Sequence, residues 1–242
     1  MSDPTLTILL PVYNEALRID RGLENARLLR DKLLSDFAGV DILIADDGSN
    51  DGSTASLPSD IQVLRLIHKG KGAAVRAGLA HTTSDWTLFT DIDWSVPVDT
   101  VYQMLRSVLN NPTDILIASR EINGATRIAE PPWRHLLGKL FNRWVQWTLL
   151  AGYMDTQCGC KILRRRTIDR LIPLMQEDGW AFDVELLLLA NLKGLSIAEF
   201  AVPWVYHPQS KVRIWRDGIA MAQAVLRMKR RLTRENDYRA WS

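Results

Sequence analysis

Short apolar runs alternate with helical patterns through the first half of the chain. Five runs have the length and the β-branched content of strands that are buried, with apolar residues on both faces. They read LTILLPV, VDILIAD, IQVLRLI, WTLFTD and DILIAS. Apolar residues at helical spacing lie between them, over 15–37, 72–81 and 97–110. This alternation predicts an α/β fold with a mostly parallel central sheet that helices cover on both sides.

The second half of the chain is less regular. A Trp-rich helical pattern covers 133–151, and we expect further helices at 166–176 and in GWAFDVELLLLANLKG. SIAEFAVPWVY reads as one strand, and 217–234 reads as a helix with apolar positions against a basic face. Because no repeat or linker divides the sequence, we expect one domain over 1–212, followed by a basic amphipathic helix and tail over 213–242.

Composition places the chain among ordinary globular proteins. Its 242 residues can bury one large core, and 47% hydrophobic and 24% charged residues are typical values. The net charge of +2 gives no reason to expect nucleic acid as a partner. Positive charge is nevertheless concentrated between 211 and 239, where nine Lys or Arg residues face three acidic ones.

The cysteines and the N-terminus indicate a cytoplasmic protein. Cys158 and Cys160 flank a single glycine, which is too close for an easy disulfide, and no nearby thiol or imidazole completes a zinc site. The N-terminal apolar run has no positive region before it and is interrupted by Pro11, so it does not read as a signal peptide. No apolar stretch reaches the roughly 18 residues that a membrane span requires.

Polar clusters follow four of the predicted strands. YNE comes after the first strand, DDGSNDGS after the second, DIDWS after the fourth and SRE after the fifth. The carboxyl ends of parallel strands meet at one edge of a sheet, and ligands bind at that edge. The sequence therefore predicts a single site built from these four loops.

Two aspartates in FTDIDWS raise a question of charge. In an extended chain, Asp91 and Asp93 point to the same side, so their repulsion must be relieved by a cation or a proton. A divalent metal ion is one explanation. The alternative is local, with Asp93 or Ser95 as the N-cap of a helix that begins near Pro97.

Two further segments have both a structural and a functional interpretation. Asp46 and Asp47 belong to a turn-forming stretch, yet they could also accept hydrogen bonds from a base and from ribose hydroxyls. HKGKGAAVRAG lacks the spacing of a P-loop or a dinucleotide motif. Lys69 and Lys71 could still meet an anion at the N-terminus of the following helix, or they are simply solvated.

Taken together and in this order, PVYNEA, ADDGSNDGST and DID resemble the motifs of family 2 glycosyltransferases, which have the nucleotide-diphospho-sugar transferase (GT-A) fold. DTQCGCKILRRRTIDRL, GWAFDVELLLLA and IAEFAVPW resemble dolichyl-phosphate and polyprenyl-phosphate β-glucosyltransferases. The resemblance runs from about Leu6 to Arg231. It implies an inverting enzyme that moves a hexose, glucose from UDP-glucose, onto a polyprenyl or dolichyl phosphate. The alternatives are a soluble GT-A enzyme with a sugar or small-molecule acceptor, and a binding protein on a decayed transferase fold.

The polar clusters and the resemblance together predict the site residues. The nucleotide-sugar site is expected at Pro11, Tyr13, Asn14, Glu15, Asp46, Asp47, Lys71, Asp91, Ser95 and Lys211. Catalytic roles are expected for Asp93, Asp183, Arg120 and Arg134. The resemblance also implies a Mg²⁺ or Mn²⁺ ion on Asp91 and Asp93. Mannose synthases have an arginine six residues before the lysine that matches Lys211, and Val205 at that position favours glucose.

The expected acceptor decides which groups the chemistry needs. A lipid phosphate is largely ionised near neutral pH, since the second pKa of a phosphate monoester is about 6. It therefore needs positioning by Arg and Lys more than a general base. Asp183 matches the position of a catalytic base in other family members, or it is a carboxylate that the helix dipole favours at a helix N-terminus.

A lipid acceptor must be met at a membrane. The Trp-rich helix at 133–151 and the basic helix at 217–234 have the composition of interfacial helices, although ordinary packed helices are also amphipathic. Eukaryotic members of the group carry an N-terminal membrane helix that this sequence does not show. We therefore expect peripheral association with the inner, cytoplasmic face of the membrane.

Overall fold

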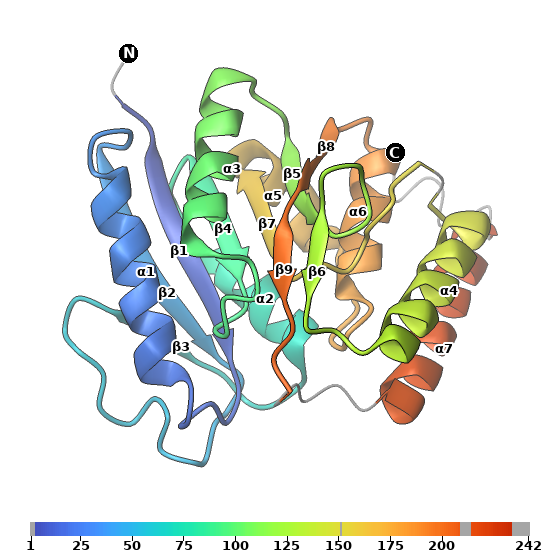
Figure 1. Ribbon diagram of the computed structural model, residues 1–242, viewed down its shortest axis with the longest axis horizontal. Coiled ribbons are helices and arrows are strands. Elements are labelled where there is room, and N and C mark those ends of the chain that lie inside the picture. The colour runs from blue at the N-terminus through green and yellow to red at the C-terminus, as the bar shows by residue number, and fades with distance from the viewer. Residues whose placement is uncertain (1–2, 151, 209–213, 234–242) are drawn as a thin grey trace.

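The computed structural model describes residues 3–150, 152–208 and 214–233 of the chain. Within them, a seven-stranded sheet has the order β3-β2-β1-β4-β7-β5-β8 (Figure 1). The strands are β1 (Thr5–Val12), β2 (Gly39–Asp46), β3 (Gln62–Arg65), β4 (Trp86–Thr90), β5 (Ile115–Ser119), β7 (Cys160–Arg164) and β8 (Ile197–Ala201). Neighbouring strands are parallel except where β7 pairs with β4 and β5. The mostly parallel sheet is confirmed.

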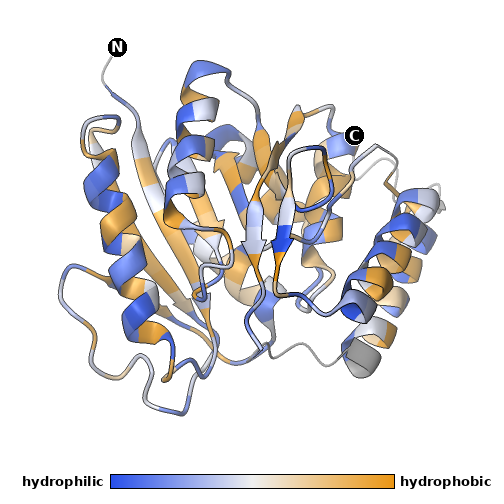
Figure 2. Ribbon diagram, in the orientation of Figure 1, coloured by the Kyte–Doolittle hydropathy of each residue, from blue (hydrophilic) through white to orange (hydrophobic). Residues whose placement is uncertain are grey.

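Helices cover both faces of this sheet (Figure 1). One face carries α1 (Ile19–Leu33) and α3 (Val98–Asn110), and the other carries α2 (Lys71–His81), α5 (Arg165–Leu171) and α6 (Phe182–Leu192). The strands and the inward faces of the helices are apolar, whereas α1 and α3 turn polar residues outward (Figure 2). Helix α6 is buried along most of its length, which its run of leucines allows. The expected α/β layers are therefore present.

Two strand predictions are wrong in part. The run IQVLRLI forms β3, which lies at the sheet edge with Gln62 and Arg65 exposed rather than buried on both faces. SIAEFAVPWVY is not one strand, because β8 ends at Ala201 and β9 (Pro203–Val205) pairs with β6 (Thr126–Ile128) in a separate two-stranded sheet. The Val202 amide donates to the carbonyl of Ser119 and its own carbonyl accepts from Thr126, so this residue connects the two sheets.

Two other elements differ from the sequence expectation. Strand β7 was not predicted, since its five residues carry Lys161 at the second position and show no alternation. The helix expected at 166–176 ends at Leu171 and continues only as a 3-10 turn, Ile172–Leu174. Pro173 has no amide hydrogen to extend the α-helical ladder.

Helices α4 (Pro132–Thr148) and α7 (Ile214–Thr233) lie side by side at one end of the molecule (Figure 1). Only Val145 of α4 is fully buried, whereas Ala224, Val225 and Met228 of α7 belong to the core. Among the described residues, no helix is both long enough and apolar enough to cross a membrane. The predicted domain boundary at 212/213 and the tail beyond 233 lie outside the described residues.

Helix α1 approaches the loop after β4 at Gly22. The Gly22 carbonyl accepts a hydrogen bond of 2.9 Å from the indole of Trp94. A Cβ atom at Gly22 would lie 2.6 Å from the backbone carbonyl oxygen of Ile92, well inside van der Waals contact. The absence of a side chain at this position therefore sets how closely α1 packs on the loop that contains Asp91 and Asp93.

Replacing Gly22 tests this packing. We expect Gly22→Ala to lower the free energy of unfolding by about 1–3 kcal/mol, as overpacking in a well-packed region does. Gly138→Ala is the control, because a Cβ there meets no atom within 4 Å. It should raise stability by up to about 1 kcal/mol through helix propensity. Urea unfolding measures both, and a Gly22→Ala protein as stable as the Gly138→Ala protein would contradict the packing argument.

Candidate functional site

The loops after β1 and β2 are joined by hydrogen bonds. The Asn14 amide donates to the Ser49 hydroxyl at 2.9 Å, and the Asn50 amide donates to the Asn14 side-chain oxygen at 2.8 Å. Asn14 reaches this position with a φ of 53°, which asparagine tolerates better than most residues. The buried carboxylate of Asp46 accepts from the Ser49 amide and the Thr54 hydroxyl. The first two predicted clusters therefore form one structure.

Asp47 binds the segment that precedes α2, at His68, Lys69 and Gly70. Its buried carboxylate accepts from the amides of Lys69 and Gly70, both at 2.9 Å, and lies 2.8 Å from Nδ1 of His68. The His68 ring stacks on Tyr13 with centroids 4.0 Å apart. The side chain of Lys69 is exposed. The stacked rings of Tyr13 and His68 thus lie beside the buried carboxylate of Asp47. Pro11, in β1, is half-buried.

Asp91 and Asp93 each face a cation from the chain itself. Nζ of Lys71 lies 2.5 Å from Oδ1 of Asp91, and a guanidinium nitrogen of Arg18 lies 3.6 Å from Oδ2 of Asp93. Arg18 also makes two hydrogen bonds, of 2.7 and 2.8 Å, to the carboxylate of Glu15. Repulsion between the two aspartates is therefore offset by side-chain cations on both sides.

The local capping explanation for these residues is wrong. Helix α3 has Pro97 as its N-cap residue and no side-chain capping bond. Instead, Oδ1 of Asp93 accepts from the amide and the hydroxyl of Ser95, both at 3.1 Å. Burial and the charge of Asp91 raise the pKa of Asp93. Asp93 thus shapes its own loop and remains beside Asp91.

A divalent ion fits this pair only as part of a larger ligand set. Among the described residues, no group of three or more His, Cys, Asp or Glu side chains is arranged to hold a metal ion. Mg²⁺ commonly takes one or two protein carboxylates, substrate phosphates and waters. Asp91 and Asp93 match that pattern, so the residues fit an ion that is shared with a bound diphosphate.

Gly159 explains why a glycine separates the two cysteines. The Asp91 amide donates to the Gly159 carbonyl at 3.1 Å, and a Cβ on Gly159 would lie 2.1 Å from Oδ2 of Asp91. The close approach of the β4 and β7 ends thus requires a residue without a side chain. The neighbouring thiols are buried, and burial raises the pKa of Cys158 to about 12, so it remains a protonated thiol.

A cavity of about 530 Å³ lies beside the carboxylates. It brings together seven predicted residues: Lys71, Asp91, Asp93, Ser95, Arg120, Arg134 and Asp183. Apolar lining comes from α4 and α7, through Leu137, Phe141, Ile219 and Met221. One cavity therefore joins charged residues from strand ends and helices to an apolar wall. Lys211 lies outside the described residues.

The two predicted arginines each lie beside an aromatic ring. Arg120 binds Asp155 through two hydrogen bonds of 2.6 and 2.9 Å and lies 5.3 Å from the ring centre of Trp204. Burial opposes ionisation of Asp155, but Arg120 lowers its pKa to about 2. Arg134 lies 5.2 Å from the ring centre of Tyr206. Both guanidinium groups are thus fixed beside the cavity.

Asp183 lies in the first turn of α6 and also lines the cavity. Its Oδ1 is 2.5 Å from Nζ of Lys161, which is fully buried and also donates to the Cys158 carbonyl at 2.7 Å. Burial raises the pKa of Asp183, while Lys161 and then Lys71 oppose that shift. The structure is compatible with both interpretations, a dipole-stabilised carboxylate and a group that faces the substrate.

Several residues of the site were not singled out from the sequence. Arg18 could have been found, because it follows Glu15 by three residues, a spacing typical of ion pairs. Asp155 and Lys161 lie in the quoted segment DTQCGCK, but nothing in their spacing indicates which carboxylate or cation they meet. His68 and Trp180 are contacts between loops that are distant in sequence.

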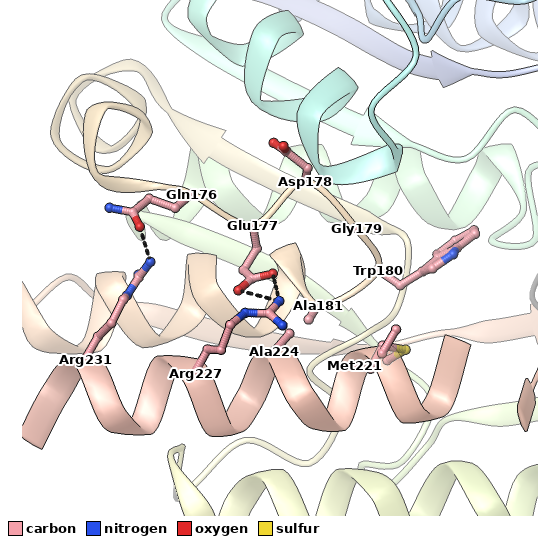
Figure 3. A pocket seen from close by; sticks show the side chains of 11 residues that line it. Gln176, Glu177, Asp178, Gly179, Trp180, Ala181, Met221, Ala224, Arg227 and Arg231 are labelled. Atoms are coloured by element: carbon pink, nitrogen blue, oxygen red, sulfur yellow. Dashed lines mark hydrogen bonds and ion pairs between the residues drawn. The ribbon is translucent and has the colours of Figure 1, made fainter. Parts of the chain in front are cut away.

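Helix α7 is bound to the loop at 176–181 through its basic residues (Figure 3). Arg227 lies 3.0 Å from Glu177, and Arg231 binds Gln176 at 2.5 Å and Glu185 at 2.8 Å. A second cavity of about 430 Å³ lies between this loop and α7. Two basic residues of the expected basic face therefore point toward the protein.

Solved structures with the same architecture are glycosyltransferases of the GT-A fold. Glucosyl-3-phosphoglycerate synthase from Mycobacterium tuberculosis, in complex with Mn²⁺, UDP-glucose and phosphoglyceric acid, has a TM-score of 0.71. It is 17% identical, and the match covers 93% of this chain and 79% of that chain. Mannosyl-3-phosphoglycerate synthase from Rubrobacter xylanophilus has a TM-score of 0.68 and 19% identity, with coverages of 97% and 76%. These similarities confirm the expected fold.

Sequence comparison extends this result to the family. A dolichyl-phosphate β-glucosyltransferase from Dictyostelium discoideum is 32% identical, over 93% of this chain and 73% of its own length. The enzyme of the same name from Saccharomyces cerevisiae is 30% identical, with coverages of 92% and 74%. The model of glycosyl transferase family 2 matches residues 7–172. The chain therefore belongs to glycosyl transferase family 2 and, within it, is similar to the dolichyl-phosphate β-glucosyltransferases.

Proposed function

We propose that this glycosyltransferase moves glucose from UDP-glucose to a polyprenyl or dolichyl phosphate, with inversion at the anomeric carbon. The observation that carries the proposal is the cavity in which paired carboxylates and four Lys or Arg residues share a space with the apolar sides of α4 and α7. A nucleotide sugar needs the charged part, and a lipid acceptor needs both parts. The names of the related sequences and the UDP-glucose in the Mycobacterium tuberculosis structure support the same pairing.

The nucleotide is assigned to the loops after β1 and β2. Tyr13 and His68 offer a stacked aromatic surface, and the buried Asp47 carboxylate beside them, with three hydrogen bonds already made, has one lone pair on Oδ1 left to accept from a base. The rest of the predicted set keeps its proposed role: Pro11, Asn14, Glu15 and Asp46 around the nucleotide, Ser95 beside Asp93 at the diphosphate, and Lys211 near the phosphates. A direct test is mass spectrometry of the products from a panel of nucleotide sugars, with and without polyprenyl phosphate.

Charge on the leaving group is the main electrostatic demand of the reaction. We assign Asp91 and Asp93 as the protein ligands of a Mg²⁺ or Mn²⁺ ion, which would neutralise the diphosphate as it leaves. Lys71, Arg120 and Arg134 line the same cavity and supply fixed positive charge. The phosphate of the acceptor arrives ionised, so these cations position it without removing a proton.

The surface of α4 is suited to a membrane interface. Its largest exposed apolar side chains are spaced along one helical stripe: Trp133 at 57%, Leu136 at 59%, Leu140 at 54% and Trp147 at 86% exposure. Lys139 and Arg143 are exposed on the same helix, and apolar and polar residues mix along this end of the molecule (Figure 2). Aromatic, aliphatic and basic side chains in this arrangement are typical of interfacial helices. We therefore propose peripheral binding to the cytoplasmic face of a membrane.

The metal proposal predicts loss of transfer when either ligand loses its charge. Asp91→Asn or Asp93→Asn should reduce the rate at least about 100-fold in Mg²⁺ or Mn²⁺, because charge stabilisation of the leaving group is lost. Asp99→Asn is the matched control, since this aspartate is exposed on α3 and contacts Lys32. Steady-state rates measure the effect. Full activity of the wild-type protein in excess chelator would contradict a metal-dependent reaction.

The membrane proposal predicts that the apolar stripe of α4 and the exposed basic residues of α7 both contribute to vesicle binding, whereas Arg227 and Arg231 face the protein. Trp133→Ser with Trp147→Ser should weaken binding to anionic vesicles by at least about tenfold, since each residue removes a large apolar surface. Lys229→Gln with Arg230→Gln should cost about 1 kcal/mol per charge near the surface. Sedimentation with vesicles measures both. If the tryptophan variant sediments like the wild type, α4 is not the interfacial helix.

The acceptor proposal predicts a mild effect of Asp183→Asn. With polyprenyl phosphate, the rate should fall by less than about tenfold, whereas base catalysis on a hydroxyl acceptor would contribute roughly 10²–10⁴-fold. Because Asp183→Asn leaves the Lys161 ammonium buried without its carboxylate, a Lys161→Met/Asp183→Asn variant serves as the stability-matched control. Initial rates from pH 6 to 9 measure the effect. A loss above about 10³-fold, with normal binding of the nucleotide sugar, would contradict this mechanism.

A further inference from the structure

Lys71 is packed into the site rather than extended into solvent. It is the first residue of α2, and its side chain is 16% exposed. Its ammonium lies 2.5 Å from Oδ1 of Asp91, 5.4 Å from the ring centre of Trp180 and 6.0 Å from that of Phe182. Lys69, two residues earlier, has an exposed side chain. The ammonium of Lys71 is therefore held between Asp91 and two aromatic rings, while the Asp91 side chain stays 37% exposed to solvent.

The start of α2 does not depend on this ion pair. The Ala73 amide donates to the Asp178 carbonyl at 3.1 Å, and Arg76 binds the Asp178 carboxylate at 2.5 Å. Asp47 accepts from the Gly70 amide one residue before the helix. The backbone around Lys71 is thus held by other groups. The ion pair between Lys71 and Asp91 is therefore not needed to fix the start of α2.

We propose that Lys71 is the resident counter-ion of Asp91, which a divalent ion must displace, so that the metal binds tightly only together with the donor diphosphate. The inference rests on the proposed role of Asp91 and Asp93 as metal ligands. Arg18 is a second and weaker counter-ion, since it lies 3.6 Å from Asp93 and is already held by Glu15.

Competition for one carboxylate explains why the metal and the nucleotide should bind together. A metal ion that takes Asp91 must break the contact between Asp91 and Lys71. The apparent affinity of the protein for the metal is therefore its intrinsic affinity multiplied by the fraction of protein in which that contact is broken. A diphosphate changes the balance because its oxygens can bind the metal and also accept the released ammonium. By linkage, the factor by which UDP strengthens metal binding equals the factor by which the metal strengthens UDP binding.

The test measures Mn²⁺ binding to the full chain by electron paramagnetic resonance of free Mn²⁺, with and without UDP. In the wild type, we expect weak Mn²⁺ binding that UDP strengthens. Lys71→Gln should bind Mn²⁺ about tenfold more tightly without UDP, the size of effect expected from removing a competing, partly buried charge. The factor by which UDP strengthens Mn²⁺ binding should fall in the same variant, because no ammonium is left to transfer to the diphosphate.

Three matched variants separate a local contact from a general change in charge. Lys69→Gln removes the same charge two residues away, and its effect on Mn²⁺ affinity should stay below about twofold because the lysine is exposed and screened. Arg18→Gln should strengthen Mn²⁺ binding less than Lys71→Gln does. Asp91→Asn should remove most of the Mn²⁺ binding with UDP present, which places the bound ion at this carboxylate.

Several results would overturn the proposal. Mn²⁺ affinity without UDP that is unchanged or weaker in Lys71→Gln would show that the lysine does not compete. An equal increase in Lys69→Gln would assign the effect to net charge, and a wild type that binds no Mn²⁺ with UDP would remove the premise. These measurements use neither a sugar nor a lipid, so failure of transfer to polyprenyl phosphate would refute the proposed function and leave this inference standing.

Discussion

Strand β7 enters the sheet between β4 and β5 and hydrogen-bonds to both in the antiparallel direction. This pairing brings the Gly159 carbonyl to the amide of Asp91 and places Lys161 beneath the first turn of α6, where it meets Asp183. Residues just before the strand also supply Asp155, which binds Arg120. A single strand, reversed relative to its neighbours, thus sets the positions of Asp91, Asp183 and Arg120.

Charge compensation is the second principle of the site. Four carboxylates of the site are each matched with a cation from a different part of the chain: Asp91 with Lys71, Asp93 with Arg18, Asp155 with Arg120 and Asp183 with Lys161. Burying an ion without a partner costs several kcal/mol, so these pairs allow many charges to share one small space. The two most buried pairs, Asp155 with Arg120 and Asp183 with Lys161, also hold their part of the site in a defined geometry before a substrate arrives.

Local pattern predicted the elements that depend on local chemistry. The apolar runs gave five strands, and the polar clusters at their ends placed Asp47, Asp91 and Arg120 at one edge, as the structure has them. Periodicity could not predict β7, because Lys161 is stabilised there by contacts with Asp183 and Cys158 that only the folded chain creates. For the same reason, the sequence did not show which cation relieves the repulsion between the two aspartates.

The inward arginines of α7 change how the C-terminal part of the chain should be regarded. Glu185 is fully buried, and its two oxygens accept from the amides of Gln176 and Glu177 and from the guanidinium of Arg231. A shortened chain that ends before α7 would keep this carboxylate in the core and lose its cation. Trp180, which lines the 530 Å³ cavity, lies in the same loop. The helix is thus an integral part of the folded protein, and a chain truncated before α7 would lose both this charge balance and one wall of the 530 Å³ cavity.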